Sequence, residues 1–287
     1  MALTSTVRIE PTGAALGADI SGIDIGGDID EPTMNAILAA WGAHLVLRFR
    51  RQNISDDQLV AFSRRFGTLD LAPITTTGKP WLPHFPELNV ISNVIDNGVA
   101  IGGLGAGESE WHTDMSYKAE PPSASILYSL EVPSAAGNTE FANMYLAADE
   151  LPADLRSRIA GRVCNHDSSM NSTGQLRKGF APITDPRDAP GVAHPMLRTH
   201  PVTKRTALFL GRRMNAHIIG MPLDESTELL DRLWAHATQA RYVWQQNWLV
   251  GDLIIWDNRC TLHRRDAFDQ NLRRVLHRAQ VAGDKPF

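Results

Sequence analysis

A histidine and an aspartate stand two positions apart in the segment WHTD, residues 111–114. In a β-strand, residues i and i+2 point to the same face, so this spacing would place the imidazole of His112 beside the carboxylate of Asp114. Two ligands hold a reactive metal weakly, and His263, which follows the apolar segment DLIIW, is the candidate for a third. Two histidines and one carboxylate leave three open positions, as in non-haem Fe(II) oxygenases that bind both an organic chelator and O2. Zinc accepts the same ligands, so a zinc centre also fits these residues.

Most of the other histidines show no comparable pattern. His166 and Asp167 are adjacent, and adjacent side chains diverge in a strand. The remaining candidates lack a partner at strand spacing, and we expect them to be structural or exposed: His44, His84, His194, His200, His217 and His236.

Two arginines near the C-terminus fall on one face of a predicted strand. Alternation in RRVLHRA, residues 273–279, groups Arg274 and Arg278 with Leu276, and about 3.3 Å per residue separates the two arginine backbones by about 13 Å. The pair could therefore bind different anionic groups in one pocket. A dicarboxylate that chelates a metal needs a cation for its far carboxylate, and arginine offers a bidentate fork. A zinc hydrolase has no such requirement.

Two further arginine pairs are less informative. We interpret Arg264-Arg265 and Arg212-Arg213 as solvated or interface charges, with one of Arg212 and Arg213 as a candidate to reach the pocket.

Short strands dominate the chain after residue 111. Several alternate with period two, as half-buried strands do: residues 125–132, 139–144, 207–211, 242–249, 252–258 and 273–283. Before them, strands are predicted at 18–25 and 44–49 and at 88–92, and helices at 31–43 and from the N-cap Ser55 to Gly67. Two more helices are predicted at 151–161 and 222–238.

These elements predict a mainly β fold with peripheral helices, of the double-stranded β-helix or jelly-roll type. No linker divides the chain, so residues 1–287 are expected to form a single domain. Residues 165–200 match no regular element and are interpreted as an insertion or lid near the site. The glycine-rich segment 98–108 is interpreted as a mobile loop rather than a phosphate cradle.

Composition narrows the class of protein. The net charge of −4 and the absence of a basic run argue against nucleic acid. The sequence shows neither a signal peptide nor an apolar run long enough to span a membrane. Two cysteines far apart in sequence fit a reducing cytoplasm, where we expect the protein to be located.

The motifs WHTD, WDNRCTLHRR and RRVLHRA resemble, in their order and spacing, the family of taurine dioxygenase and 2,4-dichlorophenoxyacetate dioxygenase. The similarity runs from PTGAALGADISGIDI to AGDKPF. It implies a jelly roll that uses Fe(II), 2-oxoglutarate and O2. By the resemblance, His112, Asp114 and His263 ligate iron, and Thr139 and Arg274 bind the distal carboxylate of 2-oxoglutarate. Arg278 then meets the anionic group of the primary substrate, and Trp256 matches an aromatic residue beside the site.

One segment departs from taurine dioxygenase, which carries a sulfonate-binding histidine after the FSRRFG-like helix. This chain reads FGTLDLAP there, with Asp70 and Ala72 and no histidine. We therefore expect a small anionic organic substrate of the aryloxyalkanoate type rather than taurine or another sulfonate, with hydroxylation yielding succinate and CO2. Arg278 is expected to lack a protein partner, and the protein is expected to be a homo-oligomer. The alternatives are a zinc-dependent hydrolase on a jelly-roll barrel and a non-catalytic jelly-roll binding protein.

Overall fold

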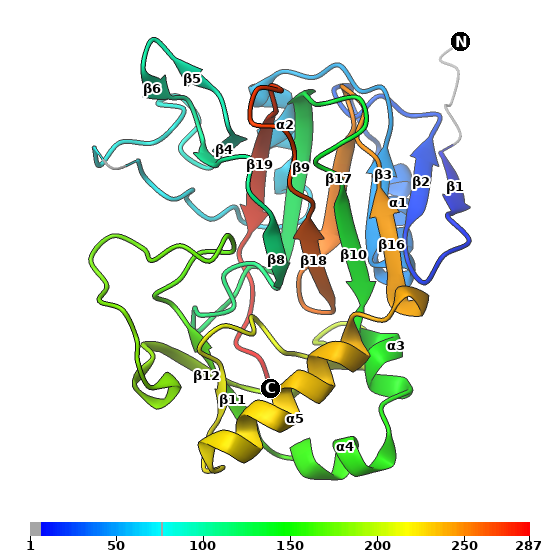
Figure 1. Ribbon diagram of the computed structural model, residues 1–287. Helices are drawn as coiled ribbons and strands as arrows, with labels where there is room; N and C mark the ends of the chain where they lie inside the picture. Colours follow the sequence, from blue (N-terminus) through cyan, green and yellow to red (C-terminus); the bar gives the residue numbers. More distant parts are fainter. Residues whose placement is uncertain (1–6, 76) are drawn as a thin grey trace.

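The computed structural model describes residues 7–75 and 77–287 and contains two facing β-sheets (Figure 1). The large sheet has the order β1 (Arg8–Pro11), β2 (Ala18–Ser21), β3 (Val46–Phe49), β17 (Leu253–Asp257), β9 (Ala124–Glu131), β19 (Val275–Val281), β4 (Asn89–Ser92) and β7 (Gly103–Leu104). The small sheet has the order β16 (Val243–Gln246), β10 (Thr139–Asn143), β18 (Thr261–Arg265) and β8 (Ser109–His112).

Smaller elements surround this pair of sheets. A three-stranded sheet consists of β12 (Gly191–Pro195), β11 (Val163–Asp167) and β15 (His217–Ile218). Two two-stranded sheets are formed by β13 (Leu197–Thr199) with β14 (Thr206–Leu208) and by β5 (Ile95–Asp96) with β6 (Val99–Ala100). The helices are α1 (Glu31–His44), α2 (Asp56–Arg64), α3 (Met144–Asp149), α4 (Ala153–Ile159) and α5 (Leu223–Ala237), with 3-10 turns at Pro186–Asp188 and Ala240–Tyr242.

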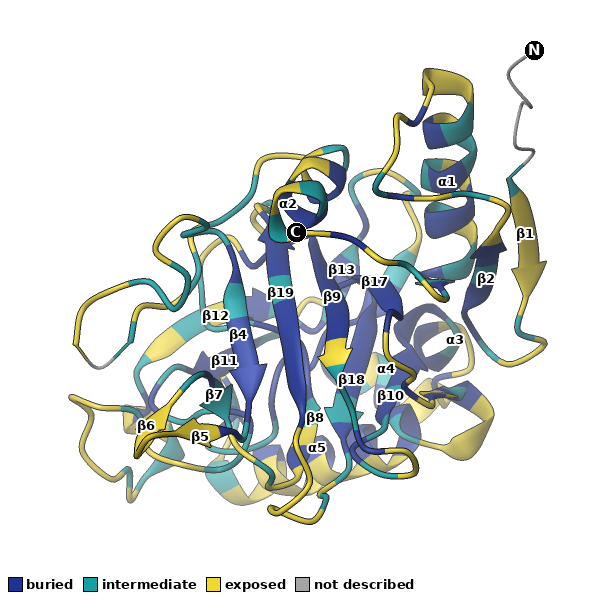
Figure 2. Ribbon diagram, turned by 90° about the horizontal axis from the view of Figure 1, so that it is seen from above, coloured by how far each residue is buried: buried dark blue, intermediate teal, exposed yellow. Residues whose placement is uncertain are grey.

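The central strands of the large sheet are buried on both faces (Figure 2). In β17, Leu253 and Ile255 belong to the hydrophobic cluster shared with α1 and α2, whereas Ile254 and Trp256 belong to the cluster between the two sheets. A strand that must be apolar on both sides reads as a continuous hydrophobic run, which is why DLIIW stands out in the sequence.

The mainly β architecture with peripheral helices confirms the prediction from sequence. Ser55 is the N-cap of α2, and its side chain forms a capping box with Gln58. The strands β8 and β18 were not assigned from sequence. In β18 the residues TLHRR are mostly polar, and the strand is buried because it lies between β10 and β8 in the small sheet.

Two irregular regions contain more structure than expected. Residues 163–199 include β11, β12 and β13, and only about residues 168–185 of that stretch are without regular structure. Residues 88–112 likewise hold β4 to β8. Within the described part of the chain, no helix combines the length and the apolar character needed to cross a bilayer.

Candidate metal centre and adjoining pockets

The structure brings His112, Asp114 and His263 together in the interior. His112 ends β8 and faces His263 of β18 across the antiparallel pair, with ring centroids 4.1 Å apart. The Oδ1 atom of Asp114 lies 3.6 Å from Nε2 of His112 and 3.8 Å from Nε2 of His263. Asp114 lies beyond the end of β8, so a turn brings it to the histidines instead of the strand alternation assumed from the sequence. Three such donor atoms at these separations could hold one divalent ion.

Neighbouring groups orient these donors. Nδ1 of His112 lies 2.7 Å from the backbone oxygen of Glu110, so it donates there and leaves Nε2 with a free lone pair. The other carboxylate oxygen of Asp114, Oδ2, accepts hydrogen bonds from Ser125 Oγ at 2.8 Å and Gln280 Nε2 at 3.2 Å. Only Oδ1 therefore faces both histidines.

The charge states of the donors suit metal binding. Burial lowers the pKa of His263 well below its usual value, and the neighbouring His112 adds to this effect, so the imidazole of His263 is neutral. Burial alone would raise the pKa of Asp114, but its neighbours, first of all the charge of Arg278, outweigh this effect and hold that pKa well below its usual value. A neutral imidazole and an ionised carboxylate are the forms that bind metals.

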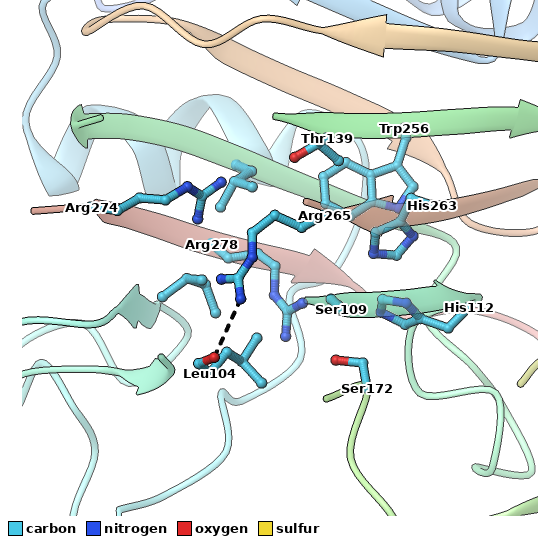
Figure 3. A pocket seen from close by; sticks show the side chains of 12 residues that line it. Leu104, Ser109, His112, Thr139, Ser172, Trp256, His263, Arg265, Arg274 and Arg278 are labelled. Atoms are coloured by element: carbon cyan, nitrogen blue, oxygen red, sulfur yellow. Dashed lines mark hydrogen bonds between the residues drawn. The ribbon is translucent and has the colours of Figure 1, made fainter. Parts of the chain in front are cut away.

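A pocket, the inner pocket, extends from the histidines to Arg274 (Figure 3). The Arg274 side chain is 2% exposed, and within the described residues its Nε has no hydrogen-bond partner. Burial, with a smaller contribution from Arg265, lowers the pKa of Arg274 to about 9. A buried guanidinium without a carboxylate partner is costly, so an anion is expected to bind there.

Thr139 and Trp256 also line the inner pocket. The Oγ1 atom of Thr139 accepts a hydrogen bond from Nε1 of Trp248 at 3.0 Å, which fixes its position. The ring of Trp256 lies 4.8 Å from that of His263 and packs beside it.

Arg265 lines the inner pocket, whereas its sequence context had been interpreted as that of a solvated or interface charge. It is 7% exposed, and its guanidinium donates to the backbone oxygens of Leu104 and Gly107. The signal that could have found it is the spacing from His263, since positions i and i+2 of β18 share a face.

Arg278 differs from expectation as well. Its Nη1 lies 3.1 Å from both carboxylate oxygens of Asp114, so it has a protein partner in this structure. The expectation of an unpartnered Arg278 was wrong, because the sequence could not show that β19 passes the turn carrying Asp114. Arg278 also lines both pockets, which leaves it within reach of a small molecule.

A second hollow, the outer pocket, adjoins the first at His112 and Arg278. Its lining combines apolar residues with three arginines: Pro73, Ile74, Trp81, Leu104, Met115, Arg177, Arg212 and Arg278 among them. Arg212 is 6% exposed and lines the outer pocket, so it is the member of the Arg212-Arg213 pair that reaches the pocket, and the interpretation as a solvated charge is wrong for it. Its neighbour Arg213 does lie at the surface, paired with Asp231 at 2.7 Å.

Asp70, in the segment that departs from taurine dioxygenase, forms an ion pair with Lys118 at 3.2 Å. It is absent from the lining of the outer pocket, which receives Pro73 from the end of this segment and Ile74 directly after it. The segment therefore presents apolar side chains to the pocket, and the charge of Asp70 is offset elsewhere.

A second group of potential ligands, His200, Asp257 and Cys260, is also buried. Asp257 is occupied by Arg259 at 2.7 Å and by Nε2 of His200 at 3.0 Å. Nδ1 of His200 accepts from two backbone N–H groups. Burial, reinforced by the charge of Asp257, raises the pKa of Cys260 well above its usual value, so the thiol stays protonated. This cluster has no free donors for a metal and braces the turn between β17 and β18, so His200 is structural, as expected from sequence.

The chain matches the model of the family described as "Taurine catabolism dioxygenase TauD, TfdA family" over residues 8–280. It is 35% identical over 287 residues to the alpha-ketoglutarate-dependent 2,4-dichlorophenoxyacetate dioxygenase of Cupriavidus pinatubonensis, covering 97% of this chain and 99% of that protein. Among solved structures, a taurine dioxygenase from Burkholderia xenovorans has a TM-score of 0.79 at 30% identity, covering 98% of this chain and 90% of that one. AAD-2 in complex with Mn(II) and N-oxalylglycine has a TM-score of 0.78 at 32% identity, covering 98% and 99%.

Proposed function

Because the chain belongs to the TauD, TfdA family and is therefore an Fe(II)- and 2-oxoglutarate-dependent dioxygenase, we propose that it hydroxylates a small carboxylate of the aryloxyalkanoate type. The apolar lining of the outer pocket beside Arg278 is the observation that carries the substrate part of this proposal. The buried Arg274 at the far end of the inner pocket, which begins at the two histidines, supports the 2-oxoglutarate-dependent chemistry. A zinc-dependent hydrolase or a non-catalytic binding protein would have no use for a buried, unpaired guanidinium at that place.

His112, Asp114 and His263 are the residues that would hold the metal. The donor set fits Fe(II), because two imidazole nitrogens and one carboxylate oxygen converge and leave coordination positions for other ligands. When bound, iron supplies the activation of O2 that couples conversion of 2-oxoglutarate to succinate and CO2 with hydroxylation of the substrate.

Arg274 and Thr139 would bind the distal carboxylate of 2-oxoglutarate. The guanidinium of Arg274 is buried and its Nε makes no hydrogen bond within the described residues, and Thr139 offers a hydroxyl held by Trp248. The rings of Trp248 and Phe268 lie 5.9 and 6.0 Å from the guanidinium carbon and exclude water around it. Such an environment strengthens an ion pair.

Arg278 would orient the carboxylate of the primary substrate beside the metal. In this structure it contacts Asp114, and a divalent ion on Asp114 would compete for the same oxygens and leave the guanidinium for an incoming anion. The apolar lining from Pro73, Ile74 and Trp81 offers surface for an aromatic ring. Asp70, which is paired with Lys118, adds no sulfonate-binding donor.

The irregular stretch 168–185 would cover the bound substrate. Asn171, Ser172 and Arg177 from this stretch line the outer pocket, which supports the interpretation of residues 165–200 as a lid within a single domain, residues 1–287.

The test is a substrate panel measured with Fe(II), 2-oxoglutarate and O2. We expect 2,4-dichlorophenoxyacetate to stimulate succinate formation and to release the phenol in equal amount, and taurine and alkyl sulfates to do so far less. Arg278→Ala should raise the KM for the best carboxylate, whereas Arg213→Ala, which removes a surface arginine, should not. Efficient taurine turnover without turnover of any aryloxyalkanoate would contradict the substrate proposal.

A further inference from the structure

The outer pocket contains more positive charge than a substrate with one acidic group would offset. Arg177 and Arg212 line it together with Arg278, and Asp114 is the only acidic residue in its lining within the described part of the chain. The lining also includes the hydroxyl-bearing Tyr117, whose ring lies 4.1 Å from the guanidinium carbon of Arg177.

Neither Arg177 nor Arg212 has a carboxylate partner among residues 7–75 and 77–287. Arg212 donates from Nη1 to the backbone oxygen of Met170, and its buried Nε is without a partner in the same residues. The carboxylate of Asp167 acts on Arg212 only at a distance, because its oxygens accept hydrogen bonds from Ser169 and Asn215.

Arg212 is placed next to the metal centre by the backbone. It forms a bridge with His112, and the adjacent Gly211 accepts a hydrogen bond from the backbone N–H of Thr113 at 2.8 Å. Arg177 is brought close by the stretch 168–185, in which its own N–H donates to the backbone oxygen of Ser169. The two guanidiniums influence each other electrostatically, since after burial the charge of Arg177 is the largest factor lowering the pKa of Arg212.

The cofactors do not neutralise this excess. The charges of Fe(II) and Arg274 together offset those of Asp114 and the two carboxylates of 2-oxoglutarate. Arg177, Arg212 and Arg278 therefore keep their charges for the primary substrate, whose first carboxylate meets Arg278 under the function proposed above. Two like charges held near each other in a partly buried pocket are stabilised by an anion between them.

We propose that Arg177 and Arg212 form a second anion subsite in the outer pocket, so that the physiological substrate is a small molecule with two acidic groups. One group meets Arg278 near the metal, and the other, a carboxylate, sulfonate or sulfate, meets Arg177 and Arg212. This inference rests on the proposed function for the position of the reacting carbon, but the second subsite can be tested by binding alone.

The binding experiment compares matched aryloxyacetates. Isothermal titration calorimetry, under anaerobic conditions with Fe(II) and 2-oxoglutarate bound, measures 3- and 4-carboxyphenoxyacetate against their neutral 3- and 4-carbamoyl analogues. We expect at least one carboxy compound to bind about tenfold more tightly than its amide, as a charge-assisted hydrogen bond would provide.

Variants locate the preference for the second charge. Arg177→Gln should remove it, since Arg177 is partly exposed and its side chain only stacks on Tyr117, so the fold does not depend on it. Arg177→Lys keeps the charge and should retain part of the preference. Arg212→Gln should also lower it, and Arg213→Gln, at the surface pair with Asp231, should leave it unchanged.

The outcomes separate the two proposals. Equal affinities for the acids and their amides in the wild type, or an undiminished preference in both Arg177→Gln and Arg212→Gln, would overturn the second subsite. Failure of every aryloxyacetate to yield succinate, together with a charge preference that Arg177→Gln removes, would reject the proposed substrate type and keep the subsite.

Discussion

Five side chains contact the carboxylate of Asp114. Its Oδ2 is held by Ser125 and Gln280, its Oδ1 faces His112 and His263, and Arg278 reaches both oxygens. These contacts orient the carboxylate before any metal arrives, and such second contacts are expected to raise metal affinity.

Replacing this carboxylate should abolish both metal retention and turnover. In Asp114→Ala, two imidazoles remain, and they cannot hold a divalent ion firmly enough to survive desalting. Metal analysis after gel filtration and succinate formation measure the two effects. Asp96→Asn, an exposed aspartate, serves as the control. Near-normal iron content and turnover in Asp114→Ala would refute the ligand assignment.

A second prediction at this scale concerns Arg274, which is buried with an unpartnered Nε among the described residues. Arg274→Met keeps most of the volume and removes the charge, so it should raise the free energy of unfolding of the cofactor-free protein by about 1–3 kcal/mol. The same variant should lose the stabilisation that 2-oxoglutarate gives to the wild type. Urea denaturation with and without 2-oxoglutarate measures both quantities. Equal stabilisation of variant and wild type by 2-oxoglutarate would place the carboxylate elsewhere.

At the scale of elements, the turn between β17 of the large sheet and β18 of the small sheet helps to position the metal centre. Asn258 in this turn accepts from the backbone N–H of Asp114 at 2.9 Å and donates to the backbone oxygens of Asp114 and Pro122, each at 2.9 Å. The network of His200, Asp257 and Arg259 braces the same turn. One turn thus sets the position of His263 through β18 and of Asp114 through Asn258.

Removing the Asn258 amide should make the position of Asp114 less well defined, although Asn258 is not itself a metal ligand. We expect Asn258→Ala to weaken Mn(II) or Fe(II) binding about tenfold, the size of effect that residues behind metal ligands show. The KM for 2-oxoglutarate at saturating metal should change little, because Arg274 lies on a different segment. Asn271→Ala, in an exposed turn, is the matched control. A larger effect on 2-oxoglutarate than on metal binding would contradict this role.

At the scale of the whole molecule, two buried histidines make stability depend on pH. Burial lowers the pKa of His166 to about 3, and burial likewise lowers that of His194, which packs against it at 5.1 Å between ring centroids. Because the folded state keeps His166 neutral, the unfolded chain binds a proton below about pH 6.5 that the folded chain does not. Stability is therefore full above that pH and falls as the pH drops towards 3.

For His166, the loss should be about 1.5 kcal/mol between pH 6.5 and pH 5. His166→Gln should remove this part of the pH dependence, although the variant will be less stable at neutral pH. The exposed His84→Gln should leave the dependence unchanged. Urea denaturation at several pH values measures it. An identical pH dependence in His166→Gln and wild type would mean that the histidine titrates normally in the folded protein.

Two expectations about the whole molecule stay predictions: a single domain over residues 1–287 and a homo-oligomer. Analytical ultracentrifugation tests the second, and a single cooperative unfolding transition would support the first.

What the sequence determined by itself depends on local patterns and motif spacing. The apolar run of β17, the N-cap at Ser55 and the spacing of WHTD, WDNRCTLHRR and RRVLHRA were sufficient for the fold class, the family and the candidate residues. These features are readable because strand alternation and helix capping involve residues close together in the chain.

Contacts between distant segments were decided only by the tertiary structure. Arg278 meets Asp114 across 164 positions, Arg212 pairs its backbone with His112, and Arg265 is buried because β18 lies between two other strands. The sequence does not show whether an arginine is surrounded by solvent or by protein. Its environment, and therefore the cost of its charge and its need for an anion, depends on which strands become neighbours when the sheets form.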